Sequence, residues 1–393
     1  MFETLTSPAP DKILALIALF RDDARPNKVD LGVGVYKDRE GRTPIMQSVR
    51  DAEQTLFAEQ TTKAYLGLAG DTAFDAAMIG LVLGGTLPTA RVRAIQTPGG
   101  SGALRILFEL LCRAHADAKV WVSDPTWPNH IPMIEAAGLK AASYPYFDAA
   151  TGMVRFDAMM STLAQAPPND IVLLHGCCHN PTGANLSLDQ WDEVGKLILE
   201  KNLFPFVDIA YQGFGEGLEA DAAGVRRLAA LVPSLVIAAS CSKNFSVYRD
   251  RVGCALLTAC SEAEADLAYA QLCSVARANY SMPPDHGAAA VRIILDDPNR
   301  RMAWTGEVDA IRERMIALRE GLAAALRAHT GSNRFDFIAR HRGMFSRLGL
   351  GVEQVHRLRV EHAIYMVDDS RINVAGLPYD RLEDVARAIV AVI

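Results

Sequence analysis

A lysine in an unusual place is the first candidate for chemistry in this chain. Lys243 follows the most apolar run of the sequence, residues 235–239, and stands in the stretch Ser-Cys-Ser-Lys-Asn of residues 240–244. Partial burial among small residues would lower the pKa of its amine and favour a neutral nucleophile that can form a Schiff base with a carbonyl compound. The alternative is an ordinary loop lysine, and position alone does not choose between the two.

A carboxylate and a phenol follow a second apolar run. Asp208 comes directly after residues 204–207, a run too apolar for a surface strand. A buried carboxylate needs a cationic partner or strong hydrogen bonds. Tyr211 lies three residues further on and could reach the same ligand. The alternative is an aspartate that caps the N-terminus of a helix, which is a common role.

A glycine-rich stretch offers a site for an anion. Gly100, Ser101 and Gly102 open an apolar helix, and the free N–H groups and positive end of such a helix attract negative charge. The stretch lacks the GKS/T of a P-loop and the GxGxxG fingerprint of a dinucleotide site, so a plain loop into a helix stays open as an alternative. Arg251 could hold the same anion, or it could form a surface salt bridge that contributes little.

Two further groups have competing interpretations. Arg371 begins a short strand, where its guanidinium could bind a carboxylate with two hydrogen bonds, although an exposed arginine at a strand edge fits the same pattern. His175, Cys177 and His179 would share one face of a strand and offer three ligands for a metal ion. No second ligand cluster accompanies them and a turn follows at residues 180–183, so we expect no metal site.

The elements that must position these residues are indicated by hydrophobic patterning. Short, nearly continuous apolar runs are typical of strands buried on both faces of a parallel sheet, and amphipathic segments between them predict helices. This alternation predicts an α/β fold, in which ligands bind beyond the carboxyl ends of the strands. We therefore expect the polar residues after four of the runs to converge. The runs are residues 120–123, 171–174, 204–207, 235–239 and 253–257, and the helical segments are residues 102–115, 188–201 and 262–275.

The character of the chain changes from about residue 305. A long charged helix is predicted over residues 312–330, and an apolar stretch at 13–20 predicts a helix near the N-terminus. We expect a large domain over residues 43–309 and a small domain that combines residues 1–42, with an N-terminal arm, and residues 310–393. Further elements of the small domain are expected at residues 345–350, 360–367, 371–374 and 382–392.

Composition excludes several classes of protein. A net charge of −6 over 393 residues argues against a general nucleic-acid binder. No apolar run reaches the roughly 18 residues needed to span a membrane. The seven cysteines lack CxxC spacing and are expected to be reduced thiols, which indicates a cytoplasmic protein.

Taken together, these motifs resemble the class I pyridoxal-phosphate aminotransferases of the aspartate/aromatic subgroup, over nearly the whole chain. The resemblance is strongest to bacterial aromatic-amino-acid aminotransferases that also accept aspartate. It implies a fold-type I α/β structure, with a mostly parallel seven-stranded sheet in the large domain and a smaller α/β domain. It also implies pyridoxal 5′-phosphate as cofactor and a homodimer with shared active sites. The stretches that carry it are residues 31–37, 65–67, 97–105, 124–130, 175–183, 208–213, 240–251, 277–281 and 370–376.

The resemblance also implies roles for the candidate residues. Lys243 would hold the cofactor covalently and move the proton of the reaction, Asp208 would pair with the pyridine nitrogen, and Asn180 and Tyr211 would bind the phenolic oxygen. His130 and His175 would support Asp208. The cofactor would be stacked by Trp127 and its phosphate held by Gly100, Ser101, Gly102, Ser240, Arg251 and Tyr65 of the partner subunit. The substrate would be bound by Gly34, Trp127, Asn180, Arg277 and Arg371.

Specificity is expected to depend on Arg277, which in this family comes from the neighbouring subunit and pairs with the distal carboxylate of aspartate or glutamate. An aromatic side chain leaves this arginine unpaired, which costs several kcal/mol unless it moves or is rebonded. The residues of this chain that bear on specificity do not all follow one pattern. Val35, Lys37 and Thr43 follow the aspartate-selective pattern, whereas Ser101, Ala64 and Met282 do not. Cys241 and Ser246 also depart from the commonest residues of the family, tyrosine and glycine, with no effect that we can assign.

The sequence therefore predicts an aminotransferase that moves the amino group of phenylalanine, tyrosine, tryptophan and aspartate to 2-oxoglutarate by a ping-pong reaction. A strict aspartate aminotransferase is the alternative within the family. Elimination or decarboxylation on the same cofactor, a binding protein with this fold, and a metal hydrolase built on His175, Cys177 and His179 are the weaker alternatives.

Overall fold

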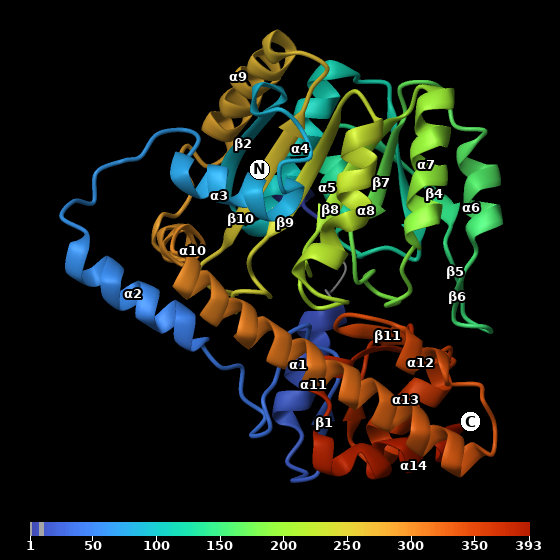
Figure 1. The fold of residues 1–393 in the computed structure, drawn as a ribbon. Coiled ribbons are helices and arrows are strands. Elements are labelled where there is room, and N and C mark those ends of the chain that lie inside the picture. Colours follow the sequence, from blue (N-terminus) through green and yellow to red (C-terminus); the bar gives the residue numbers. More distant parts are fainter. Residues whose placement is uncertain (1, 8–11) are drawn as a thin grey trace.

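Seven strands form the central sheet of the computed structural model, which describes residues 2–7 and 12–393. Their order is β2–β10–β9–β8–β7–β3–β4, and helices cover both faces, so the predicted α/β class is confirmed (Figure 1). All five apolar runs are strands. The strands are β2 (Val92–Pro98), β3 (Lys119–Asp124), β4 (Lys140–Pro145), β7 (Ile171–His175), β8 (Phe204–Ile209), β9 (Leu235–Ser240) and β10 (Val252–Thr258).

The direction of one strand differs from the prediction. Residues 253–257 were expected in a parallel sheet, but β10 pairs antiparallel with both β2 and β9. The reason is the connection, because only residues 241–251 join β9 to β10 and no helix returns the chain to the opposite edge. The other pairs that the strands form, from β9 through to β4, are parallel.

Alternate residues of the strands point to opposite faces and build two apolar cores. Leu173 and Phe206 belong to the core under one set of helices, whereas Leu174 and Val207 belong to the core under the other. The first set is α4 (Gly99–Ala114), α5 (His130–Ala136) and α9 (Glu262–Asn279). The second set is α3 (Thr72–Leu83), α6 (Phe156–Leu163), α7 (Leu188–Lys201), α8 (Leu218–Leu231) and α10 (His286–Asp296).

The longest helix, α11 (Pro298–Thr330), begins fourteen residues before the predicted start. Its beginning is fixed by Asp297, whose side chain accepts hydrogen bonds from two backbone N–H groups, and by Pro298 in the first turn. Gly331 ends it in a left-handed conformation, with φ +65°. Figure 1 shows α11 running from the sheet to the C-terminal part of the chain. The expected boundary between residues 309 and 310 lies inside this helix and stays a prediction.

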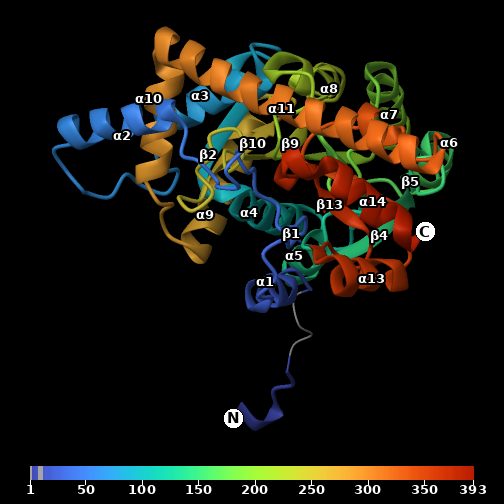
Figure 2. The same cartoon turned by 90° about the horizontal axis from the view of Figure 1, so that it is seen from below.

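A separate apolar core joins the C-terminal residues to the N-terminal segment. It includes Val29 and Leu31 and residues from Leu318 to Val392. The element expected at residues 360–367 is divided, because the helix Val352–His362 extends into it and Ala363, in a left-handed conformation, separates that helix from a two-residue strand. The elements here are α1 (Lys12–Asp22), β1 (Val29–Asp30), α12 (Phe337–Arg340), β11 (Phe345–Arg347), α13 (Val352–His362), β12 (Ile364–Tyr365), β13 (Arg371–Asn373) and α14 (Leu382–Val392). Seen from below, α1 lies beside α13, and α14 lies between α13 and α11 (Figure 2).

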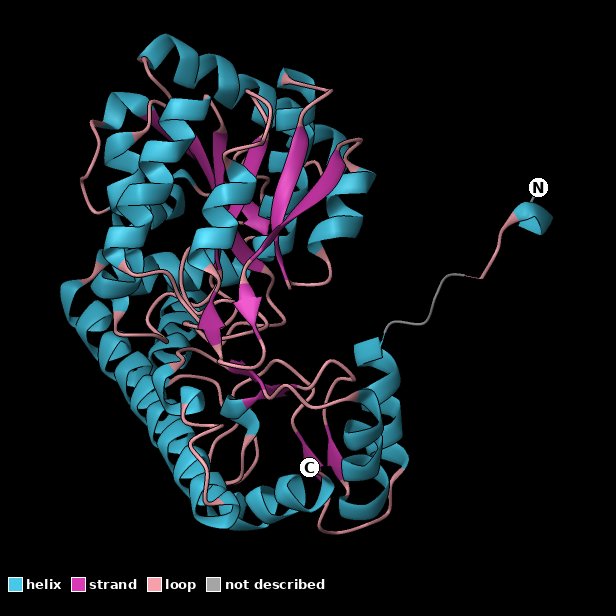
Figure 3. Ribbon diagram, turned by 90° about the vertical axis from the view of Figure 1, so that its right-hand side faces the viewer, coloured by secondary structure: helices cyan, strands magenta, loops and turns pink. Residues whose placement is uncertain are grey.

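The remaining elements are peripheral. The helix α2 (Gln47–Glu59) lies at the outer side, and β5 (Phe147–Asp148) pairs with β6 (Met153–Val154). Short 3₁₀ turns lie at Thr89–Arg91, Val374–Gly376 and Tyr379–Arg381. A further one, Phe2–Thr4, lies away from the body of the molecule (Figure 3). Among the described residues, no helix combines the length and the apolar character that crossing a membrane requires.

Candidate active site

The polar residues predicted at the strand ends meet at one edge of the sheet. A cavity of about 250 Å³ lies beyond the carboxyl ends of β7, β8 and β9. The order of the strands reverses nearby, between β3 and β7, which is where open α/β sheets bind ligands. Predicted site residues that line the cavity are Gly34, Gly100, Ser101, Trp127, Asn180, Asp208, Tyr211, Ser240, Lys243, Arg251 and Arg371.

Lys243 lies in the turn between β9 and β10 with its amine over an aromatic ring. The Nζ atom is 4.8 Å from the centre of the Tyr211 ring. Burial lowers the pKa of Lys243 to about 8, with the Asp208 carboxylate opposing the shift and the Arg251 guanidinium adding to it. A substantial share of the amine is therefore neutral near pH 7.5, as attack on a carbonyl requires.

Asp208 is held by a chain of side chains. It lies within β8 and not at a helix start, so the helix-cap alternative is wrong. Burial alone would raise its pKa, but a hydrogen bond from His130 at 3.0 Å and nearby positive charge keep the pKa of Asp208 below its ordinary value. Thr126 Oγ1 lies 2.8 Å from His130 Nδ1 and 3.2 Å from His175 Nε2. His130 thus donates from Nε2 to Asp208, and the Thr126 hydroxyl bridges the two imidazole rings.

His175 belongs to the same buried group. Burial, together with the neighbouring His130, lowers the pKa of His175 to about 3, so this ring stays neutral. It lies beside Asp208 across the β7–β8 pair, because these two residues are register partners. The carboxylate therefore presents an ionised oxygen to the cavity while two imidazole rings and a hydroxyl fix its orientation.

An amide and a phenol form the next part of the wall. Asn180 Nδ2 donates to the Tyr211 hydroxyl oxygen at 3.3 Å, and burial raises the pKa of Tyr211. The Asn180 Oδ1 atom is buried without a hydrogen-bond partner among the described residues. Trp127 meets His130 edge to face, with ring centroids 5.3 Å apart. A buried amide oxygen without a partner is costly in a folded protein, so it indicates a place where a ligand donates.

The glycine-rich stretch is the first turn of a helix and not a loop. The helix α4 begins at Gly99, whose φ of +73° suits glycine, and this places Gly100 and Ser101 at the positive end. Arg251 covers this end, since a Cβ on Gly99 would lie 2.5 Å from its Nη2, and its Nη1 donates to Ser242 Oγ at 3.3 Å. The arrangement forms a cradle for an anion such as a phosphate.

Arg371 is buried, so the exposed strand-edge interpretation is wrong. Its guanidinium lies 4.6 Å from the centre of the Phe345 ring, and Nη2 donates to the carbonyl of Gly32 at 2.8 Å. Burial lowers the pKa of Arg371 from its ordinary value. The Nε atom is buried without a hydrogen-bond partner within the described ranges. A guanidinium stacked on a ring, with a donor unused, suits the binding of a carboxylate.

Three predicted residues do not line the cavity within one chain. Gly102 faces Pro98 in the first turn of α4. Tyr65 is 92% exposed, and Arg277 is exposed on α9 with a hydrogen bond to Ser281. The sequence-based roles of Tyr65 and Arg277 require a partner subunit, so a single chain does not place them.

Other lining residues were not predicted. These include Tyr248 and Phe345, and Tyr248 also accepts a hydrogen bond from the backbone N–H of Tyr36 at 3.2 Å. Ser242, which also lines the cavity, is one of the polar residues expected after the apolar run 235–239, and Tyr248 lies in the stretch 240–251 that carries the family resemblance. Phe345 had no such signal, because an aromatic residue in a short apolar strand is typical of a core.

The metal hypothesis fails on geometry. The strand β7 ends at His175, so Cys177 and His179 do not continue along its face. Among the described residues, the side chains that come close enough to share a metal ion are Cys177, Cys178 and Asp221. The Asp221 carboxylate already accepts hydrogen bonds from three backbone N–H groups and so stabilises the loop at residues 213–216.

Known proteins share this architecture over the full chain. The family model for aminotransferases of class I and II matches residues 26–389. The aromatic-amino-acid aminotransferase of Paracoccus denitrificans is 51% identical, and the aspartate aminotransferase of Escherichia coli is 44% identical, with all of both chains covered in each case. The structure of a Burkholderia pseudomallei aromatic-amino-acid aminotransferase covalently bound to pyridoxal phosphate has a TM-score of 0.97 at 44% identity, covering 100% of this chain and 99% of that chain.

These matches extend over nearly every element that builds the cavity. The matched residues 26–389 include each of the predicted site residues, from Gly34 to Arg371. The seven-stranded sheet, the half-buried lysine after β9 and the anion cradle at α4 are thus features of a chain that belongs to the class I and II aminotransferase family.

Proposed function

We propose that this enzyme uses pyridoxal 5′-phosphate to move the amino group of phenylalanine, tyrosine, tryptophan and aspartate to 2-oxoglutarate. The observation that carries the proposal is that an amine with a lowered pKa, an ionised carboxylate and an anion cradle meet in one cavity. Lys243, Asp208 and Arg251 supply these three groups. The names of the relatives, which include both aromatic and aspartate aminotransferases, support the dual range of substrates.

The residues present fit this cofactor. The cradle of Gly100, Ser101, Ser240 and Arg251 suits its phosphate, and the unpartnered Oδ1 of Asn180 marks a polar position in the wall. The remaining cofactor contacts would come from Trp127, Asn180, Tyr211, Asp208 and Lys243, with Gly102 supporting the first turn of α4. When bound, the cofactor supplies an electron sink for the negative charge that develops at the substrate Cα.

The side chains of the chain divide the remaining work. Lys243 would attach the cofactor. Once the substrate has displaced it, the Lys243 amine would take the proton from the substrate Cα and deliver it to the C4′ carbon of the cofactor. Asp208, held ionised by His130, would stabilise a protonated pyridine nitrogen. Tyr211, beneath the amine, and Asn180 would hold the phenolic oxygen.

Arg371 would bind the substrate α-carboxylate. The guanidinium is fixed by Phe345 and by the carbonyl of Gly32, so the Arg371 side chain loses little conformational freedom when the substrate binds. Gly34 lines the cavity beside it, where a side chain would intrude, because a Cβ at this position would lie 3.0 Å from the Phe345 ring. Movement of the small domain, residues 1–42 and 310–393, against residues 43–309 would close the site and exclude water.

A homodimer would complete each site. Tyr65 is 92% exposed beside Leu66, which is 47% exposed, and such apolar exposure is typical of an interface. The partner subunit's Tyr65 would reach the phosphate, and the partner subunit's Arg277 would meet the distal carboxylate of aspartate. Met282 and Ala64 at the mouth of the pocket, and Ser101 inside it, would leave room for an aromatic ring.

The visible spectrum of the holoenzyme tests the proposal. We expect a cofactor band that Lys243→Ala alters, and we expect L-phenylalanine and L-aspartate, each added without an oxo acid, to discharge the band at similar rates. The absence of any cofactor band would contradict the proposal. Discharge by aspartate alone would favour the aspartate-selective alternative.

A substitution at Arg277 tests the specificity. Arg277→Ala should lower kcat/KM for aspartate by about 100-fold or more and that for phenylalanine far less, because one buried charge pair is lost only with aspartate. Arg113→Ala removes another exposed arginine, from α4, and serves as the control. Equal losses for both substrates would show that Arg277 does not bind the distal carboxylate.

A further inference from the structure

The turn that carries Lys243 is in contact with a tryptophan from α11. Trp304 is completely buried, and its Nε1–H donates to the backbone carbonyl of Asn244 at 2.8 Å. Its ring stacks on Phe245, with centroids 4.2 Å apart and an interplanar angle of 7°. One side chain therefore holds both of the residues that follow Lys243.

The turn has little regular structure of its own. Phe245 donates to the carbonyl of Cys241 at 3.3 Å and Ser246 donates to the carbonyl of Lys243 at 3.0 Å, so these bonds stay inside the turn. Ser246 also adopts φ +55°, which is unfavourable for a residue with a side chain. Internal bonds fix the shape of a turn but not its orientation toward a cavity. The orientation depends on the surface against which Asn244 and Phe245 pack.

That surface belongs to a helix with a second link to the cavity. The helix α11 also carries Arg319, a fully buried guanidinium that donates to the carbonyls of Gly343 and Phe345 at 2.8 and 2.6 Å. Phe345 lines the cavity and stacks on Arg371. Trp304 and Arg319 thus connect two walls of the same cavity through one continuous helix, which is visible in Figure 1.

We infer that Trp304 is a positioning residue for the amine of Lys243, an inference that rests on the proposed role of Lys243 in holding the cofactor. Trp304 is absent from the cavity wall and so acts through Asn244 and Phe245. The hydrogen bond separates this role from ordinary core packing, because phenylalanine at position 304 would keep an aromatic ring against Phe245 and leave the Asn244 carbonyl without its donor. The amine would then sample positions away from the Tyr211 ring.

The matched pair Trp304→Phe and Trp191→Phe tests the inference in the holoenzyme. Trp191 is a buried tryptophan on α7 in the same apolar core, where its ring lies against Gly224 of α8, so its substitution reproduces the loss of core volume. We expect Trp304→Phe to lower kcat about tenfold, because the loss of one oriented hydrogen bond corresponds to a factor of about this size. The KM for the amino acid should stay within about twofold of the wild-type value. We also expect the pH midpoint of the visible cofactor band to shift by about half a unit or more. Trp191→Phe should change neither quantity.

Each result has a defined meaning. A Trp304→Phe enzyme with the wild-type kcat and band midpoint would overturn the inference, and so would equal effects in the two variants. If Trp304→Phe does not yield folded protein, Phe245→Leu replaces it, since it removes the stacking surface and should also shift the band midpoint by about half a unit or more. An unchanged midpoint in Phe245→Leu would then overturn the inference. A wild-type protein without a band that depends on Lys243 would instead contradict the proposed function itself.

Discussion

The lowered pKa of Lys243 leads to a quantitative prediction for the cofactor-free protein. The ordinary value of a lysine is 10.5, and burial brings the pKa of Lys243 to about 8. This difference corresponds to about 3 kcal/mol in favour of the neutral amine. At pH 7.5 about a quarter of the Lys243 amines would be neutral, compared with about one in a thousand for an ordinary lysine. The protein would thus hold the nucleophile ready before the cofactor arrives.

Two substitutions should move this pKa in opposite directions. Asp208→Asn removes a negative charge that favours the protonated amine, so the pKa of Lys243 should fall further. Arg251→Gln removes a positive charge that disfavours the protonated amine, so the pKa should rise. A purely local effect of burial would leave both variants at the wild-type value.

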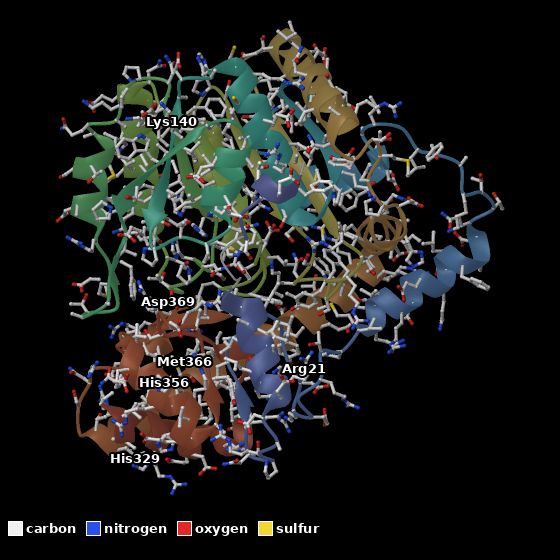
Figure 4. All side chains as sticks on the ribbon, turned by 180° about the vertical axis from the view of Figure 1, so that it is seen from behind. Arg21, Lys140, His329, His356, Met366 and Asp369 are labelled. Atoms are coloured by element: carbon white, nitrogen blue, oxygen red, sulfur yellow. The ribbon has the colours of Figure 1, made fainter. Side chains whose placement is uncertain are left out.

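Competitive labelling measures the prediction directly. The cofactor-free protein is treated with trace acetic anhydride at a series of pH values, and the modified peptides are quantified by mass spectrometry. Lys140, an exposed lysine on β4 that Figure 4 labels in the sheet region, gives an internal reference in the same digest. A labelling curve for Lys243 that coincides with that of Lys140, or a rise in pKa for Asp208→Asn, would refute the reasoning.

Three substitutions outside the reacting groups give further predictions. Burial, with the nearby charge of Asp71, raises the pKa of Asp75 to about 8, so this carboxyl should destabilise the fold progressively as pH rises from about 4 to 8. Asp75→Asn should therefore raise the melting temperature at pH 8.5 more than at pH 5.5, and a pH-independent difference would contradict this. Ser246→Gly should raise stability by about 1 kcal/mol in denaturant titrations, because φ is +55° and the buried hydroxyl oxygen has no partner among the described residues. Arg319→Met should cost about 3 kcal/mol or more, since several buried carbonyls lose their donor, and a melting temperature within about 2 °C of wild type would argue against that role.

Much of the site could be predicted from local sequence. The helices α7 and α14 begin and end at the predicted residues, and α7 opens with a capping box formed by Ser187 and Gln190. The strands β7, β8 and β9 follow from apolar runs that are buried on both faces. Short-range patterns suffice here because capping, helical spacing and continuous apolarity are properties of neighbouring residues. The polar residues after those strands then had to share one edge of the sheet.

Tertiary structure decided what depends on distant partners. The direction of β10 follows from its pairing with β2 and β9, and the burial of Arg371 follows from Phe345 and Gly32 packing around it. Neither is encoded in the spacing of nearby residues, because a strand or an arginine of the same local sequence could face solvent. The contact of Trp304 with Asn244 joins residues sixty positions apart and is of the same kind. The sequence by itself thus determined which side chains could do the chemistry, whereas only the packing of remote elements decided how they are held.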